Sequence, residues 1–184
     1  MSAPAALLLI DVQQSFLYRP YWSKQEWPQF SASVSRLISG ALAKSVPIAH
    51  IFHVEKSGPF SLESGLVKLM EGIPPHSDAL FQKHVHNAFT DTDLKHWLDK
   101  RGIGKVIVSG IRTEQCCETT TRVASDLGYE VDFVTEATLT FPMTHAHSGR
   151  TYTAAEIREK TELVLAQRFA AIRSVDEALA GLEA

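Results

Sequence analysis

Runs of apolar residues alternate with amphipathic segments along most of this chain. Continuous apolar runs, such as 6–12 (ALLLIDV) and 105–109 (KVIVS), are typical of strands that are buried on both faces. The segment 31–45 instead spaces its apolar residues three or four positions apart, which predicts an amphipathic helix. The predicted strands are 6–12, 47–54, 79–83, 105–109, 130–134 and 169–172, and the predicted helices are 31–45, 91–101, 114–127 and 153–168.

Strands that alternate with helices of this length predict βαβ units and a parallel sheet with helices on both faces. We therefore expect an α/β fold, a three-layer α/β/α sandwich of the Rossmann-like kind with a central, mostly parallel six-stranded sheet. A chain of 184 residues that is 45% hydrophobic can bury one substantial core but not two. Residues 1–184 are accordingly predicted to form a single domain.

Charge and cysteine content narrow the class of protein. The formal net charge is -3, with 18 basic and 21 acidic residues, so we expect no nucleic-acid partner. The longest apolar run near the N-terminus stops at Asp11, so we expect no signal peptide and no membrane-spanning helix. The two cysteines, Cys116 and Cys117, are adjacent and too close for an unstrained disulfide. A reducing compartment, the cytoplasm, is the simplest interpretation.

Three reactive residues are predicted at one edge of the sheet, because ligands of such folds bind beyond the carboxyl ends of the strands. Asp11 ends the first strand, Lys83 ends the third, and Cys116 lies in the turn and helix after the fourth. With Thr113 as the N-cap, the helix dipole and a nearby lysine would lower the pKa of the Cys116 thiol. Asp11 could then carry the proton, and backbone N–H groups could hold an oxyanion.

Each of these residues also has an ordinary structural interpretation. A cysteine in a helix is most often a small buried hydrophobic residue. Asp11 could cap a turn, and Lys83 could be a solvated surface charge. The placement of all three at the same sheet edge is what favours catalysis.

Three segments resemble the isochorismatase-like cysteine hydrolases, the nicotinamidase-related amidohydrolases. They are ALLLIDVQQSF, FQKHVHNAFTDTDL and VIVSGIRTEQCCETTTRVASDLGYEV. The resemblance implies an isochorismatase-like fold with a catalytic triad of Asp11, Lys83 and Cys116. The nucleophile of the family stands three positions after a threonine, here Thr113, which selects Cys116 and leaves Cys117 as its packing neighbour.

The resemblance also implies a cis peptide bond between Ile111 and Arg112. Its implied use is to aim the N–H of Arg112, beside that of Cys116, at the oxyanion. Arg112 would suit a substrate carboxylate, but an ion pair with a neighbouring acid fits equally well. His145 and His147 either line the pocket or belong to a solvated loop. The candidate substrate contacts are Phe16, Tyr18, Trp22, His53, Phe60, Arg112 and His145.

Departures from the family pattern bear on the reaction. Metal-dependent nicotinamidases carry Asp-x-His after the second strand, where this chain reads HVEKS, so no metal site and no cofactor are expected. True isochorismatases of this fold lack the cysteine and cleave a vinyl ether. Cys116 therefore favours hydrolysis of a C–N bond in a small amide, imide or ureide, through a covalent acyl-enzyme.

Two other classes of protein stay open, together with a question about assembly. One is a catalytically silent binding or scaffold protein that retains the fold, and the other is a thiol redox protein that uses Cys116 and Cys117. The resemblance implies a homodimer or a larger homo-oligomer. Trp22, Trp27 and Phe30 lie in a segment that is predicted to be a loop, where exposed aromatic residues would mark an interface or a lid.

Overall fold

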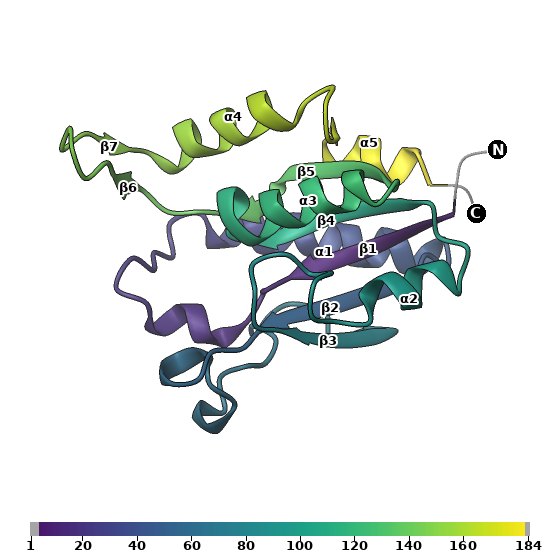
Figure 1. The fold of residues 1–184 in the computed structure, drawn as a ribbon, viewed down its shortest axis with the longest axis horizontal. Coiled ribbons are helices and arrows are strands. Elements are labelled where there is room, and N and C mark those ends of the chain that lie inside the picture. The colour runs from purple at the N-terminus through teal and green to yellow at the C-terminus, as the bar shows by residue number, and fades with distance from the viewer. Residues whose placement is uncertain (1–3, 183–184) are drawn as a thin grey trace.

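A six-stranded parallel sheet forms the centre of the protein, as the computed structural model of residues 4–182 shows (Figure 1). The strand order is β3-β2-β1-β4-β5-β8, and every neighbouring pair is parallel. The central strand β1 is apolar throughout, and its neighbours are mostly apolar, because helices cover both faces of the sheet. The strands of this sheet are β1 (Ala5–Ile10), β2 (Ile48–His53), β3 (Ala79–Lys83), β4 (Lys105–Ile111), β5 (Glu130–Leu139) and β8 (Ala171–Ile172).

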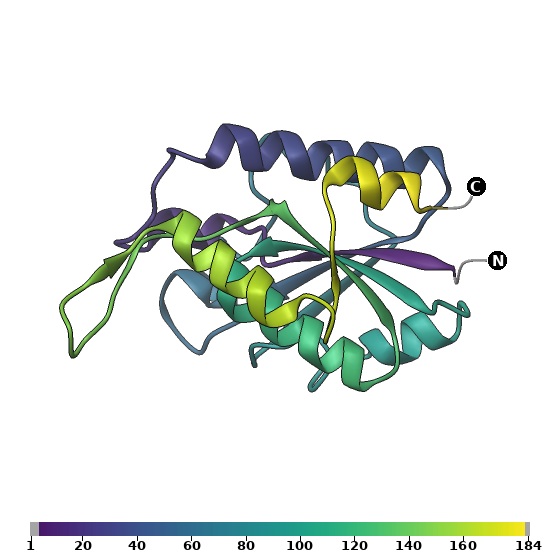
Figure 2. The same cartoon turned by 90° about the horizontal axis from the view of Figure 1, so that it is seen from above.

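Helices form a layer on each face of this sheet (Figure 2). Helices α1 (Trp27–Ala43) and α5 (Val175–Ala180) share one apolar core with the sheet, and α2 (Leu94–Asp99), α3 (Glu118–Asp126) and α4 (Ala154–Leu165) share the other. The predicted three-layer α/β/α sandwich is therefore confirmed. No helix within residues 4–182 has the length and apolar character that a membrane crossing needs.

The segment before the first helix differs from the sequence prediction. Helix α1 begins at Trp27, four residues early, because Pro28 occupies the first turn, where its missing N–H costs nothing. Phe30 is 2% exposed, and Trp22 and Trp27 pack against the same core. Trp22 lies in the loop before α1 as predicted, whereas Trp27 and Phe30 belong to the helix. The prediction that the three aromatic residues are exposed was wrong, because their rings pack in or against the core beside α1.

Two elements near the C-terminus were not predicted. Strands β6 (Met143–Thr144) and β7 (Thr151–Tyr152) form a short antiparallel hairpin that extends away from the sheet (Figure 1). Helix α5 has only six residues, too few for a helical pattern to be recognised in sequence. Its Ser174 caps it through the Glu177 N–H, and the Glu177 carboxylate accepts from Ser174 in return.

Strands β1 and β4 approach each other closely at Gly110, which lies opposite Ile10. Its φ is +134°, and a Cβ placed there would lie 2.0 Å from the carbonyl oxygen of Ile10. We expect Gly110→Ala to lower the free energy of unfolding by about 3 kcal/mol or more, because both the clash and the backbone angle oppose any side chain. Urea denaturation measures this difference.

Gly181→Ala is the matched control. At Gly181 the nearest atom to an added Cβ is 3.4 Å away, and φ is −76°. We expect a change within about 0.5 kcal/mol there. Equal effects at the two positions would contradict a specific requirement for glycine beside Asp11.

Candidate active site

Four polar residues lie at one edge of the sheet, each at or after the end of one of four neighbouring strands. His53 and Lys83 are the last residues of β2 and β3, and Asp11 follows β1 directly. Cys116 lies in a π-helical turn (η4, Thr113–Cys117) that follows β4. Because parallel strands end at a common edge, residues that are up to 105 positions apart meet there.

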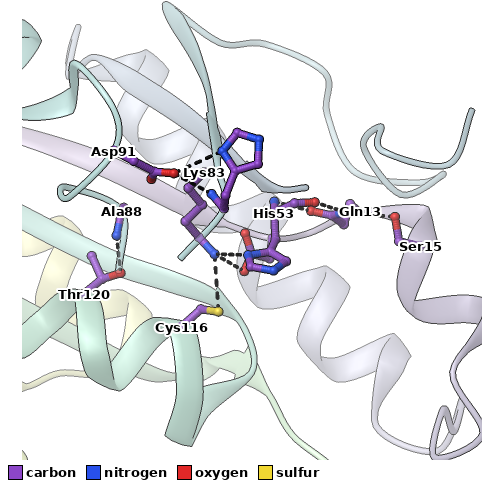
Figure 3. A network of polar contacts seen from close by, with 10 residues as sticks. Gln13, Ser15, His53, Lys83, Ala88, Asp91, Cys116 and Thr120 are labelled. Atoms are coloured by element: carbon purple, nitrogen blue, oxygen red, sulfur yellow. Dashed lines mark hydrogen bonds and ion pairs between the residues drawn. The ribbon is translucent and has the colours of Figure 1, made fainter. Parts of the chain in front are cut away.

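The Lys83 ammonium lies at the centre of this group (Figure 3). Its Nζ is 2.8 Å from Asp11 Oδ2, 3.3 Å from Cys116 Sγ and 3.1 Å from His53 Nδ1. The side chains of Lys83 and Asp11 are 0% and 1% exposed. Lys83 is therefore not a solvated surface charge, since it is fully buried and these three groups are the hydrogen-bond partners of its ammonium among the described residues.

The Asp11 carboxylate has one oxygen in use and one free. Oδ2 accepts from Lys83, whereas Oδ1 is buried and has no hydrogen-bond partner within residues 4–182. A carboxylate oxygen and Cys116 Sγ lie within 4.8 Å of each other. The backbone of Asp11 adopts the left-handed region, with φ of 54°, which is uncommon outside glycine and frequent at functional sites.

Burial and charge set the protonation of the site. Burial, and next to it the Asp11 carboxylate, raise the pKa of the Cys116 thiol more than Lys83 lowers it. Burial also raises the pKa of Asp11 against the effect of Lys83. Burial lowers the pKa of Lys83, but Asp11 and Cys116 outweigh it and raise that pKa. The pKa of the thiol is therefore raised rather than lowered as expected, because the dry site disfavours a thiolate next to a carboxylate.

The turn that carries Cys116 also differs from the prediction. Thr113 is not its N-cap: its hydroxyl donates to Thr138 Oγ1 at 2.8 Å, and Arg112 takes the cap position without a side-chain bond. Cys116 is 8% exposed and Cys117 is 0% exposed, and both thiols are free. Of the two, Cys116 alone contacts Lys83.

The Ile111–Arg112 peptide bond is cis in the structure, at the position that the resemblance implies. It joins the end of β4 to the π-helical turn, between Gly110 and Cys116. The cis bond therefore lies at the start of the turn that carries the Cys116 thiol.

The Arg112 side chain is committed to protein groups. Its guanidinium forms an ion pair with Glu114 at 3.0 Å and stacks over the Tyr21 ring at 4.8 Å. Glu114 also accepts from Thr140 Oγ1 at 2.6 Å. Of the two roles considered for Arg112, the ion pair with a neighbouring acid is the one that the structure contains.

The remaining candidate contacts divide into three groups. Phe16 and Phe60 are buried edge to face, with ring centres 5.0 Å apart, and the Phe60 ring packs against His53 at 6.1 Å. Trp22 packs into the core beside Phe141. Tyr18 is 63% exposed. Phe60 is thus the aromatic residue of this set that contacts a polar group of the site.

His145 lies apart from the triad, on the β6–β7 hairpin. It is exposed, and its ring centre is 5.9 Å from that of His147. It lines a cavity of about 720 Å³ between the hairpin and α4, together with Glu114 and Leu163. Neither Asp11 nor Lys83 lines this cavity, so His145 is not among the residues that the fold brings to the thiol.

Gln13 was not recognised in the sequence. It is fully buried, and its side-chain amide holds the backbone of His53 from both sides: Oε1 accepts from His53 N at 2.8 Å, and Nε2 donates to His53 O at 3.0 Å. The only sequence signal is a glutamine two residues after Asp11, which by itself is uninformative. Its effect depends on β2 lying next to β1.

A metal ion does not fit this site, although Asp11, His53 and Cys116 offer ligand atoms within 4.8 Å of one another. The Lys83 ammonium already contacts all three groups, so a second cation would face strong repulsion at short range. Glu55, the other potential ligand after β2, is paired with Arg19 at 2.6 Å.

We expect hydrolytic activity to survive exhaustive treatment with EDTA, because the Asp-x-His pair expected of a metal site after β2 is absent and Glu55 is paired with Arg19. The measurement is product release before and after chelation and dialysis, with and without added zinc. Activity that disappears and returns with zinc would contradict this expectation. It would identify His53, Glu55 and His76 as ligands.

Comparison with known proteins agrees with this architecture. The sequence matches the Isochorismatase domain family over residues 5–175. It is 33% identical over 153 residues to Nicotinamidase 3 of Arabidopsis thaliana, covering 74% of each chain. It is 26% identical over 182 residues to the isochorismatase family protein YrdC of Bacillus subtilis, covering 96% of this chain and 95% of that protein.

Solved structures show the same fold. An isochorismatase from Pseudomonas putida KT2440 superposes with a TM-score of 0.85 at 27% identity, covering 94% of this chain and 89% of that one. A cysteine hydrolase from Pseudomonas syringae pv. phaseolicola superposes with a TM-score of 0.84 at 21% identity, covering 96% and 91%, which bears on the fold alone. The family match over nearly the whole chain, together with the Asp11, Lys83 and Cys116 cluster, shows that this chain belongs to the isochorismatase family.

Proposed function

We propose that this protein is a cysteine hydrolase that cleaves a C–N bond in a small amide, imide or ureide. The observation that carries the proposal is the contact of one buried ammonium, Lys83, with both a carboxylate and a thiol. A nucleophile, a base and a cation in a dry site are what acyl transfer to sulfur requires. A silent binding protein would have no use for a buried lysine in this arrangement.

The first step forms the acyl-enzyme. Asp11 takes the proton from the Cys116 thiol, and the sulfur attacks the carbonyl carbon of the substrate. The unpaired Oδ1 of Asp11 supports this role, because it is a buried acceptor without a partner among the described residues, on a carboxylate that has an oxygen within 4.8 Å of the thiol. The backbone N–H groups of Arg112 and Cys116 stabilise the oxyanion. Asp11 then gives the proton to the leaving nitrogen as the C–N bond breaks, which leaves a thioester on Cys116.

The second step restores the enzyme. Asp11 takes a proton from water, the hydroxide attacks the thioester carbon, and the C–S bond breaks to release the acid. The departing sulfur takes up the proton held by Asp11, so the thiol and the carboxylate return to their starting states. The raised pKa of Asp11 suits a group that must accept and return a proton near neutral pH.

Hydrolysis of a panel of small amides, imides and ureides tests the proposal and identifies the substrate, with ammonia measured for primary amides and the products measured by mass spectrometry for the rest. Intact-mass measurement during turnover should also show the acyl group on the protein. The absence of hydrolysis across the panel, together with a loss of two hydrogens from the thiol pair on mild oxidation, would favour a redox role instead.

We further propose one domain over residues 1–184, a location in the reducing cytoplasm, and assembly into a homodimer or larger homo-oligomer. The aromatic residues at the start of α1 do not support assembly, because they pack in or against the core. Two large apolar side chains on the α4 side do, since Leu163 is 78% exposed and Met143 41% exposed.

Light scattering at micromolar concentration should therefore give at least twice the chain mass of 20.4 kDa. A single species at the mass of one chain would remove the proposed assembly.

A further inference from the structure

Lys83 has one hydrogen-bond partner that the proposed reaction does not use. An ammonium has three N–H donors and no acceptor. Two of the three are directed at Asp11 and Cys116, and the third is directed at His53 Nδ1, 3.1 Å away (Figure 3). All three N–H donors of the Lys83 ammonium are thus in use, so its position depends on His53 as well as on the two reacting groups.

The contact fixes the protonation state of His53. Because the ammonium can only donate, Nδ1 must accept, so the imidazole is neutral and carries its proton on Nε2. A protonated imidazole would place a second positive charge 3.1 Å from Nζ. Burial, and then Lys83, lower the pKa of His53 more than Asp11 raises it, which agrees with this state.

His53 is held firmly in this position. It pairs with Lys83 in the β2–β3 register, so the two side chains leave the sheet side by side. The buried amide of Gln13 fixes its backbone on both sides, and the Phe60 ring packs edge to face against the imidazole. Gln13 is two residues from Asp11, so the segment that supplies the base also fixes the imidazole.

We propose that His53 is a positioning residue whose neutral imidazole holds the Lys83 ammonium against Cys116 and Asp11. Without this acceptor the ammonium has a free N–H and turns toward water, which weakens its contact with the sulfur. This inference rests on the proposed function, because it assigns His53 a role in preparing the thiol for attack.

The charged and titratable groups around His53 define its response to pH. Lys83 faces Nδ1, Asp11 and Cys116 each offer an atom within 4.8 Å of a ring nitrogen of His53, and His86 lies beside the ring with centres 6.4 Å apart. Protonation of His53 in acid therefore sets two cations against each other and displaces Lys83 from the thiol. The thiol therefore loses its contact with the Lys83 ammonium as the pH falls through the pKa of His53, which lies below its ordinary value.

The first test compares His53→Asn with His53→Leu, each combined with Cys117→Ala so that iodoacetamide reports on Cys116 alone. Asn carries an oxygen near the position of Nδ1, whereas Leu fills similar volume without an acceptor. We expect the His53→Leu variant to be labelled about tenfold more slowly than the parent at pH 7, because it loses one hydrogen bond to a charged group. This loss should be smaller than that caused by Lys83→Met. The His53→Asn variant should be labelled at a rate within about threefold of the parent. Parent-like labelling of the Leu variant, or an equal loss in both variants, would overturn the proposal.

The second test is a ¹⁵N NMR titration of the His53 ring in otherwise unaltered protein, which does not depend on the folding of the Leu variant. The neutral form should carry its proton on Nε2, with a midpoint below about 6.5. In Lys83→Met the midpoint should rise, because the neighbouring cation is gone. A proton on Nδ1 in the neutral form, or the same midpoint with and without the lysine, would disprove the contact.

Failure of this inference can be told apart from failure of the proposed function. If Cys116→Ala is inactive on the panel and His53→Leu behaves as the parent, only the role of His53 is lost. If Cys116→Ala still hydrolyses the panel, the proposed function falls, and the role of His53 falls with it whatever the titration shows.

Discussion

Cys116→Ala is expected to reduce hydrolysis by at least about a thousandfold, whereas Cys117→Ala should stay within about threefold of the parent. The reason is geometric. Cys116 Sγ receives the Lys83 hydrogen bond, and Cys117 is fully buried in the apolar core on the α2–α4 face of the sheet. Removal of the Cys117 sulfur leaves a small cavity, which costs about 1 kcal/mol of stability but removes no reacting group.

Steady-state rates on a substrate from the amide panel measure the difference. Cys116→Ser is the matched control, because it keeps the side-chain shape and replaces a thiol with a hydroxyl that hardly ionises. The Cys116→Ser variant should be as inactive as Cys116→Ala, and both variants should unfold at a urea midpoint near that of the parent. An inactive Cys117→Ala variant together with an active Cys116→Ala variant would identify Cys117 as the nucleophile instead.

Strands β1 and β4 were predicted within two residues at each end, because their local patterns are decisive. Strand β3 was predicted with the bounds that the structure shows, although ALFQK is a weaker pattern. Continuous apolar runs between turns leave few alternatives. The start of α1 was missed because the pattern was traced from Ser31, although Pro28 marks a first helical turn. The β6–β7 hairpin and α5 are too short to carry a pattern.

The contacts of the site also divide into those that could be predicted from the sequence and those that could not. Asp11, Lys83 and Cys116 could be predicted together because the fold sends the carboxyl ends of its strands to one edge. The contact of His53 with Lys83 could not, since it depends on the β2–β3 register. The pKa of Cys116 was expected to fall and instead rises, because burial depth cannot be derived from a local motif.

Lys83→Met and Asp11→Asn are expected to change the reactivity of Cys116 in opposite directions while both nearly abolish hydrolysis. Lys83 lowers the pKa of the thiol and Asp11 raises it. Loss of the lysine should therefore slow iodoacetamide labelling at neutral pH, because less thiolate is present, and the rate should recover toward the parent at high pH. Loss of the carboxylate should speed labelling at neutral pH, since a thiolate no longer faces a negative neighbour.

Hydrolysis separates these electrostatic effects from proton transfer. Asp11→Asn has a more easily ionised thiol but no group to carry the proton to the leaving nitrogen, so turnover should fall by about a thousandfold or more. Lys83→Met keeps the carrier, but its thiolate forms less readily, so hydrolysis at neutral pH should fall as well. The measurement is the pH dependence of labelling in a Cys117→Ala background beside the hydrolysis rate of each variant. If Asp11→Asn labels more slowly than the parent, the carboxylate does not oppose the thiolate. If Lys83→Met labels like the parent at every pH, the ammonium 3.3 Å from the sulfur does not stabilise it.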